Sequence, residues 1–352
     1  MIGIDLFSGA GGLSLGAIHS GIDVKYAVES DLQAALTFSE NHKQTKIFQQ
    51  NINQISSDNF SEISNQTKEL ILFGGPPCQG FSTSNQRSRD KNNSQNWLFQ
   101  EFIRLAKDLT PEWVVIENVK GLLETNNKLF FEKIISDLSY LGYKTNHFLL
   151  NAADFGVPQN RVRVFIIGSK RGKLILPPKE QKKKVSVKEA LLDLPEVGNG
   201  NKISTLPYSQ NAHSKYALQM RDTTNGLCNN NLVTKNSLEI IERYKYIPQG
   251  GNWENIPESL MLNYADRTRC HTGIYKRLVE SEPSVTIGNF RKSMLINPWK
   301  NRGLSVREAA RLQSFPDSFI FHGSIGFQQQ QVGNAVPPLL AKVIFQRILQ
   351  MV

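Results

Sequence analysis

The first 168 residues alternate short apolar runs with amphipathic ones, and this alternation limits the possible folds more than any other feature. The apolar runs predict strands at Ile2–Phe7, Val24–Glu29, Ile47–Ile52, Leu70–Gly75, Trp113–Asn118, Asn146–Asn151 and Val164–Gly168. The amphipathic runs predict helices at Asp31–His42, Trp97–Leu109 and Lys128–Leu141. Strands that alternate with helices are typical of an α/β fold with a doubly wound, mostly parallel sheet. Ligands of such a sheet bind beyond the carboxyl ends of its strands, so we expect a site in the loops there.

Beyond residue 168 both the composition and the charge change. The stretch 170–188 is basic, and 196–236 is rich in Asn, Gly, Ser and Thr with little periodicity. Residues 169–303 hold 22 Lys and Arg against 12 Asp and Glu, whereas the rest of the chain holds 19 of each kind. The whole net charge of +10 therefore lies in this segment. A segregated excess of this size favours binding of a polyanion such as nucleic acid over a merely solvated surface.

These differences predict two domains. We expect residues 1–170 to form the sheet domain and 171–304 to form a smaller, loop-rich domain. The sequence SVRE at 305–308 has the spacing of a capping box at a helix start, and an amphipathic helix is predicted from about residue 336 to 349. Because regular periodicity returns there, residues 305–352 are predicted to rejoin the first domain.

The three cysteines, Cys78, Cys228 and Cys270, lie far apart, and no C-x-x-C occurs. This spacing argues against a zinc site, a redox pair and a disulfide framework, so we expect no metal. The first residues do not have the pattern of a signal peptide, and no apolar stretch reaches the ~18 residues of a membrane span. We therefore expect a cytoplasmic protein, of bacterial or phage type, that does not bind a membrane.

The first loop, DLFSGAGGLSLG at residues 5–16, follows an apolar strand and begins a helix. Glycines at 9, 11 and 12 let the backbone approach a ligand closely, although Ser14 stands where a dinucleotide-binding loop has its third glycine. Glu29 ends the next predicted strand, where a carboxylate can accept hydrogen bonds from both ribose hydroxyls. Together they favour a nucleoside cofactor without a pyrophosphate over a simple tight turn.

Three further loops carry groups suited to attack on a pyrimidine ring, although each residue taken singly also fits a structural role. Cys78 follows two prolines in GGPPCQGFS, Glu117 ends an apolar strand, and Arg161 and Arg163 alternate in QNRVRV, which predicts that both project from one face of a strand. A thiolate adds to C6 of a pyrimidine only if the developing charge is stabilised, which a protonated Glu117 at N3 and an arginine near O2 would do. C5 then becomes nucleophilic and can attack an adenosine-linked methyl donor. Cys78 reaches C6 only if the base leaves the duplex, so base flipping is required.

In their order along the chain these motifs resemble those of the DNA (cytosine-5) methyltransferases of bacterial restriction-modification systems, which use S-adenosylmethionine. DLFSGAGGLSLG resembles the cofactor loop of that family, VESD its ribose-binding strand end, GGPPCQGFS its nucleophile loop, ENVKG its glutamate motif and QNRVRV its paired arginines. LSVREAARLQSFPDSF and VGNAVPP resemble its two late motifs. The resemblance covers essentially the whole chain. It implies a Rossmann-like methyltransferase fold in which the basic segment is the target-recognition domain.

The resemblance also implies roles for the matching positions. The implied catalytic residues are Cys78 as nucleophile, Glu117, Arg161 and Arg163. The implied cofactor residues are Phe7, Ser8, Gly9, Gly11, Gly12, Leu13, Glu29, Ser30, Asn51, Ile52, Pro76, Leu98, Asn334, Ala335 and Val336. The implied DNA-binding residues are Gln79, Ser82, Ser84, Arg87, Asn118 and Gln159. The implied partners are double-stranded DNA and a cognate restriction endonuclease, and we expect a monomer.

The chain departs from the family pattern at two places. Asn51 stands where the family has an Asp near the adenine, which predicts weaker cofactor binding, and Asn93-Ser94-Gln95 replaces an Asp-x-Arg of the mobile loop. Two alternatives remain open. A tRNA cytosine methyltransferase on the same scaffold is disfavoured by Gln79 after the cysteine and by the long recognition segment. A DNA-binding homologue without activity is disfavoured by the complete set of catalytic groups.

Overall fold

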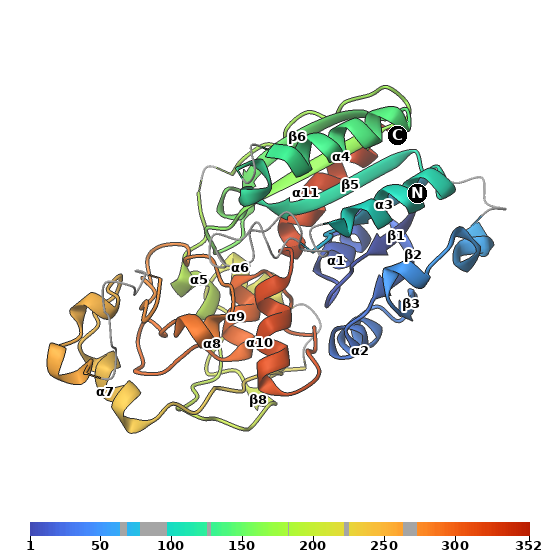
Figure 1. Cartoon of the computed structure of the whole chain (residues 1–352). Helices are drawn as coiled ribbons and strands as arrows, with labels where there is room; N and C mark the ends of the chain where they lie inside the picture. The colour runs from blue at the N-terminus through green and yellow to red at the C-terminus, as the bar shows by residue number, and fades with distance from the viewer. Residues whose placement is uncertain (64–68, 78–96, 125–127, 182, 222–224, 263–272) are drawn as a thin grey trace. The chain divides into compact units, whose positions relative to one another are not determined.

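The computed structural model describes residues 1–63, 69–77, 97–124, 128–181, 183–221, 225–262 and 273–352. Its contacts divide the chain into two compact units, whose elements are labelled in Figure 1. Unit 1 comprises Met1–Phe155, Val162–Glu180 and Pro338–Val352, and unit 2 comprises Gly156–Arg161 and Gln181–Pro337. Among the described helices, none combines the length and the apolar character needed to cross a bilayer.

Unit 1 is built on one seven-stranded sheet with the order β3-β2-β1-β4-β5-β7-β6. Its strands are β1 (Ile2–Leu6), β2 (Asp23–Glu29), β3 (Lys46–Gln49), β4 (Leu70–Gly74), β5 (Trp113–Val119), β6 (Lys144–Asn151) and β7 (Val162–Ser169). The first five strands are parallel, and β7 lies antiparallel between β5 and β6. The order reverses at β1, from which the chain winds outward to β2 and β3 before it returns to β4. This arrangement confirms the predicted doubly wound, mostly parallel sheet.

Several strand boundaries differ from the prediction, and two of the differences bear on predicted site residues. β3 ends at Gln49, because Asn51 leaves the sheet and its Oδ1 accepts a hydrogen bond from the backbone N–H of Asn53 at 3.1 Å. This local bond caps the 3₁₀ turn η1 (Ile52–Gln54) and competes with strand pairing, as asparagine side chains commonly do. β7 begins at Val162, so Arg161 lies outside the strand that was expected to carry both arginines.

The helices of unit 1 are α1 (Gly12–Ser20), α2 (Leu32–Asn41), α3 (Phe99–Leu109), α4 (Leu129–Tyr140) and α11 (Pro338–Leu349). α3 and α4 cover one face of the sheet, where Phe102 and Ile134 belong to the main apolar cluster. α1 packs against α11, and the rings of Phe345 in α11 and Phe73 in β4 lie 4.9 Å apart. Gly16 permits the approach of these two helices, because a Cβ there would collide with α11. The sheet is therefore apolar on both faces, and the chain's polar groups collect at its ends.

Unit 2 has the loop-rich character predicted for the second part of the chain. Its elements are α5 (Val187–Leu191), β8 (Leu206–Pro207), α6 (Lys215–Arg221), β9 (Leu227–Cys228), α7 (Leu238–Lys245), α8 (Phe290–Ser293), α9 (Val306–Leu312) and α10 (Ile325–Asn334). Short helices and two-residue strands leave many backbone groups without regular partners. Buried side chains supply those partners: Arg302 Nε donates to the Val197 carbonyl at 2.7 Å, and Asn230 donates to the Phe321 carbonyl at 2.9 Å.

Residues 305–337 belong to unit 2, which corrects their predicted return to the first domain. Ser305 does begin α9 with the predicted capping box. The reason for the different assignment is the buried Arg311, whose guanidinium bonds Asp193 Oδ1 at 2.6 Å and Asp317 Oδ2 at 2.5 Å. These bonds tie α9 to segments of unit 2, and only Pro338–Val352 returns to unit 1.

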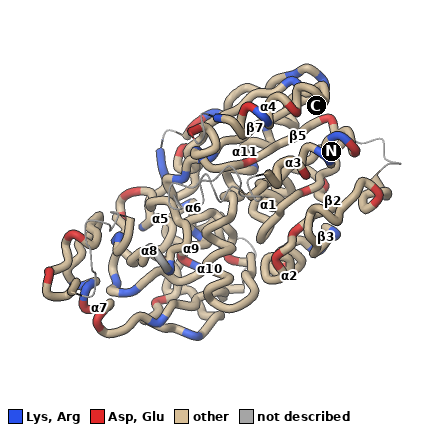
Figure 2. Tube along the Cα trace, viewed as in Figure 1, with Lys and Arg blue, Asp and Glu red and all other residues tan. Residues whose placement is uncertain are grey.

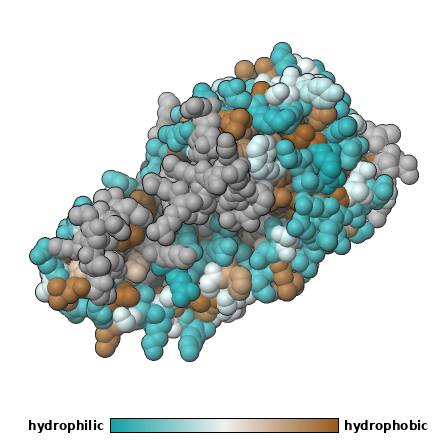
Figure 3. Space-filling model, in the orientation of Figure 1, coloured by the Kyte–Doolittle hydropathy of each residue, from teal (hydrophilic) through white to brown (hydrophobic). Residues whose placement is uncertain are grey.

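The basic excess of residues 169–303 is not all on the surface. Arg243, Arg277 and Arg302 are buried inside unit 2. Figure 2 shows that basic and acidic positions are interspersed along both units. On the face drawn in Figure 3, hydrophilic and hydrophobic residues also alternate over short distances. The exposed part of the charge excess is therefore smaller than the sequence suggested.

Candidate active site

The carboxyl ends of β1, β2, β4 and β5 lie along one edge of the sheet, because these strands are parallel and pair through β1 and β4. The glycine loop follows β1, Glu29 ends β2, and Gly75 follows β4. Glu117 and Asn118 are among the last three residues of β5. The sheet thus brings together the segments that were predicted to bind the cofactor and the one that leads into the nucleophile loop.

Glu29 ties the glycine loop to the end of β2. Its Oε2 accepts a hydrogen bond from the backbone N–H of Gly9 at 2.8 Å, and its Oε1 accepts one from Asp31 N–H at 2.7 Å. Burial raises the pKa of the Glu29 carboxyl, while these two backbone hydrogen bonds act in the opposite direction. Ser30 Oγ also donates to Oε1 at 3.5 Å, whereas Oε2 keeps a second lone pair, so Glu29 can still accept a hydrogen bond from a ligand.

The glycine loop has a backbone that few residues can adopt. Gly9 and Gly11 have φ angles of +55° and +94°, and a Cβ at Gly11 would collide with the rings of His42 and Phe38. Phe7 also lies in the left-handed region, with φ of +60°. That conformation is unfavourable for a bulky residue, and such strain is concentrated at functional sites. The loop is therefore built for a close approach of its backbone and of the Phe7 ring to another molecule.

The residues around this loop fit an adenosine-type cofactor. Among the described residues, the buried hydroxyl of Ser8 has no hydrogen-bond partner, as expected of a group that a ligand satisfies. Ile52 belongs to the main apolar cluster, and the partly buried Phe7 and Leu98 pack against it. Apolar surface for a base thus lies in the same cluster as the loop that holds Glu29. Gly12 and Leu13 are buried in the first turn of α1, and Ser30 and Asn51 are exposed.

Glu117 and Arg163 form an ion pair across the β5–β7 pair of strands. Arg163 Nε lies 3.0 Å from Glu117 Oε1, and the two side chains are 13% and 10% exposed. A Cβ at Gly75 would lie 3.1 Å from Glu117 Oε2, so the glycine leaves room for the carboxylate over the backbone that leads to residue 78. Asn118 Nδ2 donates to the Pro76 carbonyl at 3.2 Å and fixes the same segment. One carboxylate and one guanidinium therefore meet at the foot of the nucleophile loop.

The predicted nucleophile, Cys78, lies outside the described residues, as do Gln79, Ser82, Ser84, Arg87 and the sequence Asn93-Ser94-Gln95. The described cysteine, Cys228, is buried in unit 2. Burial raises the pKa of the Cys228 thiol to about 12, which makes it a poor source of thiolate at neutral pH.

The family model of the C-5 cytosine-specific DNA methylases matches residues 1–350 of the chain. The chain belongs to this family. It is 36% identical over 351 residues to the Type II methyltransferase M1.HphI of Haemophilus parahaemolyticus, covering 99% of this chain and 86% of that one. It is 34% identical to the Type II methyltransferase M.DdeI of Desulfomicrobium norvegicum, with 98% and 88% covered. A solved E. coli structure, described as a candidate DNA modification methyltransferase encoded within a prophage, superposes with a TM-score of 0.81 at 26% identity over 99% of both chains.

In this DNA methyltransferase the two paired arginines have different surroundings. Arg161 is buried in unit 2, where its Nη1 and Nη2 donate to the carbonyls of Ile287 and Gly333 at 2.8 and 2.9 Å. Gln159 is also buried, and it donates to the Leu312 carbonyl at 3.1 Å while its Oε1 accepts from Ile287 N–H at 2.8 Å. The catalytic role of Arg161 and the DNA contact of Gln159 therefore stay predictions, and in this structure both side chains bind backbone groups of unit 2. Both side chains hold the backbone of unit 2 and do not present their polar groups outward.

Asn118, which was predicted to bind DNA, is in a similar situation. Its side chain is buried, with Nδ2 bonded to Pro76 and Oδ1 accepting from Val119 N–H at 2.9 Å. The late-motif residues lie at the end of α10 in unit 2, where Asn334 is exposed and Ala335 and Val336 are buried. Their contact with a cofactor remains a prediction.

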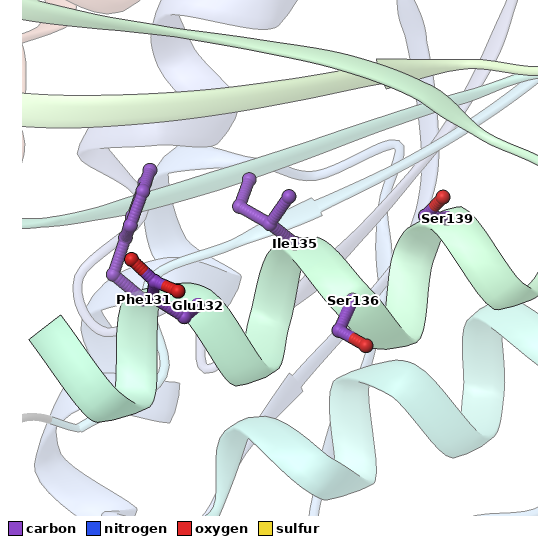
Figure 4. Close-up of a pocket in the computed structure, with 5 residues that line it drawn as sticks. All are labelled: Phe131, Glu132, Ile135, Ser136 and Ser139. Carbon is purple, nitrogen blue, oxygen red and sulfur yellow. The ribbon is translucent and has the colours of Figure 1, made fainter.

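A shallow depression on α4 is lined by none of the residues predicted to bind the cofactor or to take part in catalysis. It is lined by Phe131, Glu132, Ile135, Ser136 and Ser139 (Figure 4). Its residues come from successive turns of one helix, and Figure 4 shows their side chains spread along that helix, not converging on a point. The methyltransferase site is therefore assigned by chemistry at the strand ends, not by this depression.

The sequence prediction missed two groups beneath the glycine loop. Asp5 is wholly buried in β1, and its Oδ2 accepts a hydrogen bond from Ser14 Oγ at 2.6 Å. Burial raises the pKa of the Asp5 carboxyl to about 8, Ser14 acts against this, and the charge of Glu29 adds to it. Burial also lowers the pKa of His42 to about 4, so that a neutral imidazole packs against Gly11. A charged residue within the apolar run IGIDL was the signal available for Asp5.

Proposed function

We propose that this enzyme transfers a methyl group from S-adenosylmethionine to C5 of a cytosine turned out of duplex DNA, with Cys78 as the nucleophile. The observation that carries the proposal is the ion pair of Arg163 and Glu117 at Gly75, where β4 leads into the Cys78 loop. A cytosine offers acceptors at O2 and N3 and a donor at its N4 amino group. A guanidinium and a carboxyl group side by side are complementary to this edge.

In the proposed reaction, the base separates the ion pair: Arg163 donates to O2, and Glu117, after it has taken up a proton, donates to N3 and accepts from the N4 amino group. The Cys78 thiolate forms a bond to C6, the C5=C6 electron pair moves to C4=C5, and the C4=N3 pair moves to N3, which takes the proton of Glu117. The resulting enamine is nucleophilic at C5. After methylation, Glu117 takes back the N3 proton, water accepts the C5 proton, and departure of the Cys78 thiolate restores the C5=C6 double bond. The target base has to leave the helix for this attack.

The cofactor would supply an electrophilic methyl group, and the chain's own residues would hold it. Glu29 would accept hydrogen bonds from the ribose hydroxyls, and Phe7, Ile52 and Leu98 would surround the base. The amides of the glycine loop would face the methionine part, with Asn334, Ala335 and Val336 as further predicted contacts. The partly exposed position of Glu29 and the unpartnered hydroxyl of Ser8 support this placement.

The relatives named as Type II methyltransferases support a role in a restriction-modification system. On this proposal the enzyme marks one short duplex sequence, unit 2 reads that sequence, and a cognate endonuclease cuts the unmodified site. A monomer is sufficient for such an activity, because all proposed catalytic groups belong to one chain.

The test is to express the full chain in a host without cytosine methylation and to sequence 5-methylcytosine at single-base resolution. We expect methylation of one position in one short motif in wild type and none above background with Cys78→Ser. Cys228→Ser is the matched control, because a serine there can still donate to Asn231 Oδ1 as the thiol does at 3.7 Å, and it should methylate like wild type. Absence of 5-methylcytosine with wild type, or its presence with Cys78→Ser, would overturn the proposal.

A further inference from the structure

Arg104 reaches from α3 to the turn that follows β3. Its Nη2 donates to the carbonyl of Ile55 at 2.8 Å and to that of Ile52 at 3.3 Å. The backbone N–H of Ile55 donates to the same Ile52 carbonyl at 3.1 Å and closes the turn η1. A short helical turn leaves its last carbonyls without partners, so the guanidinium acts as a cap on η1.

Two carboxylates of α3 orient this guanidinium. Glu101 Oε2 accepts from Arg104 Nε at 2.8 Å, and Asp108 Oδ2 lies 3.8 Å from Nη1. Ion pairs between neighbouring turns of an exposed helix contribute little stability by themselves. What distinguishes Arg104 from an ordinary surface arginine is therefore its pair of contacts to backbone carbonyls of a different element.

The turn and the helix that Arg104 joins carry the residues expected around the base of the cofactor. Ile52 belongs to η1, and Leu98 is the residue that precedes α3. Ile52 and Ile55 lie in the main apolar cluster, and Leu98 packs against it. Because Arg104 binds η1 from α3, it fixes the distance between the two apolar segments that would flank the base.

We propose that Arg104 is a positioning residue that sets the geometry of the base subsite without touching the cofactor. This inference rests on the proposed function, because it takes Ile52 and Leu98 to be the residues that surround the cofactor's base. Loss of the guanidinium would leave the Ile52 and Ile55 carbonyls with one donor fewer, and η1 would shift relative to α3. The base would then lose its close packing against Ile52 and Leu98, while Glu29 could still accept hydrogen bonds from the ribose.

The experiment measures the affinity of the full chain for S-adenosylhomocysteine and for its inosine counterpart by titration calorimetry, without DNA or turnover. Wild type should bind the adenine compound more tightly than the hypoxanthine one, whose base has an oxygen in place of the amino group. In Arg104→Met we expect the dissociation constant for S-adenosylhomocysteine to rise about tenfold and the preference between the two bases to fall to within about twofold. Arg104→Lys keeps a cation near Glu101 but lacks the planar guanidinium. In this variant the dissociation constant for S-adenosylhomocysteine should rise about threefold.

The control is Lys133→Met, which removes an exposed ion pair between Lys133 and Asp137, 2.6 Å apart on α4, with no contact to a carbonyl of another element among those described. It should bind both compounds like wild type. The melting temperature of each variant reports whether the substitution lowers general stability. A purely structural effect would raise the dissociation constants of both compounds by the same factor. Unchanged affinity in Arg104→Met, or an equal loss for both bases, would overturn this inference. A wild type that does not bind S-adenosylhomocysteine would instead overturn the proposed function.

Discussion

Unit 2 buries six arginines, whereas none of the described arginines of unit 1 is buried. The six are Arg161, Arg243, Arg277, Arg302, Arg307 and Arg311. Arg277 uses all five of its donors inside unit 2, on the carbonyls of Tyr244, Ile247, Asn297 and Lys300 and on Asn301 Oδ1. In unit 1, by contrast, the half-buried Arg163 pairs with a single carboxylate, that of the buried Glu117, at the strand ends.

This difference shows how the same residue type serves two purposes in one chain. The sheet of unit 1 is stabilised by apolar burial on both faces, at roughly 25 cal/mol per Å² of buried apolar surface, so its folding depends on fewer buried polar groups. The long loops of unit 2 have no regular ladder, and buried guanidiniums satisfy their carbonyls instead. A buried charge is tolerated only when its donors are paired, as those of Arg277 are. Polar groups of unit 1 are therefore expected to act in chemistry, and buried ones of unit 2 in folding.

The largest expected effect comes from removing the carboxyl group of unit 1. Glu117→Ala should lower kcat by about 10⁴-fold, and Glu117→Gln by about 10²-fold, because glutamine can still donate to N3 but cannot deliver a proton. Folding should be unaffected, as measured by circular dichroism and melting temperature. Exposed Glu124, paired with Lys120 at 2.8 Å, is the matched control, and Glu124→Gln should keep wild-type kcat. If Glu117→Ala lowered the melting temperature and left kcat unchanged, the proposed distinction between the two units would be wrong.

The next largest effect concerns the buried arginines of unit 2. Arg277→Met removes a donor from each of four carbonyls, although that of Tyr244 still accepts from Ile247 N–H at 3.2 Å. The variant should destabilise unit 2 by about 3 kcal/mol, measured by hydrogen exchange of amides in residues 238–262 and 273–302. DNA affinity should fall, while the affinity for S-adenosylhomocysteine should stay within about twofold of wild type. Lys245→Met, on exposed Lys245 of α7, should change neither quantity. Equal protection of these amides in Arg277→Met and wild type would show that the guanidinium is not a structural support.

The smallest effect tests the one buried acid under the cofactor loop. The Asp5 carboxyl, whose pKa is raised to about 8, holds a proton in the folded chain that the unfolded chain releases above its usual pKa. The contribution of Asp5 to stability should therefore fall as pH rises from about 4 to about 8, by at most ~1.4 kcal/mol per pH unit. His42, whose pKa is lowered to about 4, contributes in the opposite direction below about pH 6.5, so the net fall is expected between about pH 6.5 and pH 8. In Asp5→Asn this slope should disappear in urea unfolding between about pH 6.5 and pH 8. Asp23→Asn, on the surface, should keep it, and an unchanged slope in Asp5→Asn would refute the assignment.

The sheet of unit 1 could be predicted because its apolar runs have the length and spacing of buried strands. The end of β3 could not, because the hydrogen bond of Asn51 to the Asn53 amide is local and has no periodicity. Residues 305–337 were assigned to the wrong unit for a different reason. The bonds of Arg311 to Asp193 join positions 118 residues apart, which no local pattern reveals.

The candidate site could be predicted where a motif places a side chain at a strand end, as for Glu29, Glu117 and Arg163. The same motifs do not reveal that the neighbouring Gln159 and Arg161 are buried. Arg104 was missed because an arginine between two acidic residues of an amphipathic helix has the sequence pattern of a solvated ion pair. Its contacts to the Ile52 and Ile55 carbonyls depend on the packing of α3 against a distant turn.

The central claim is that Cys78, at the end of a segment fixed by Asn118 and lined by Glu117, attacks C6 of the target cytosine. It is tested most directly by incubating the full chain with cofactor and a duplex that carries 5-fluorocytosine at the mapped position. Fluorine at C5 cannot leave as a proton, so the Cys78–C6 bond cannot be released after methylation. The account predicts a covalent protein–DNA complex by intact-mass spectrometry, with the nucleotide on the peptide that contains Cys78. Methylation of the ordinary duplex without any trapped complex, or a complex on another cysteine, would contradict it.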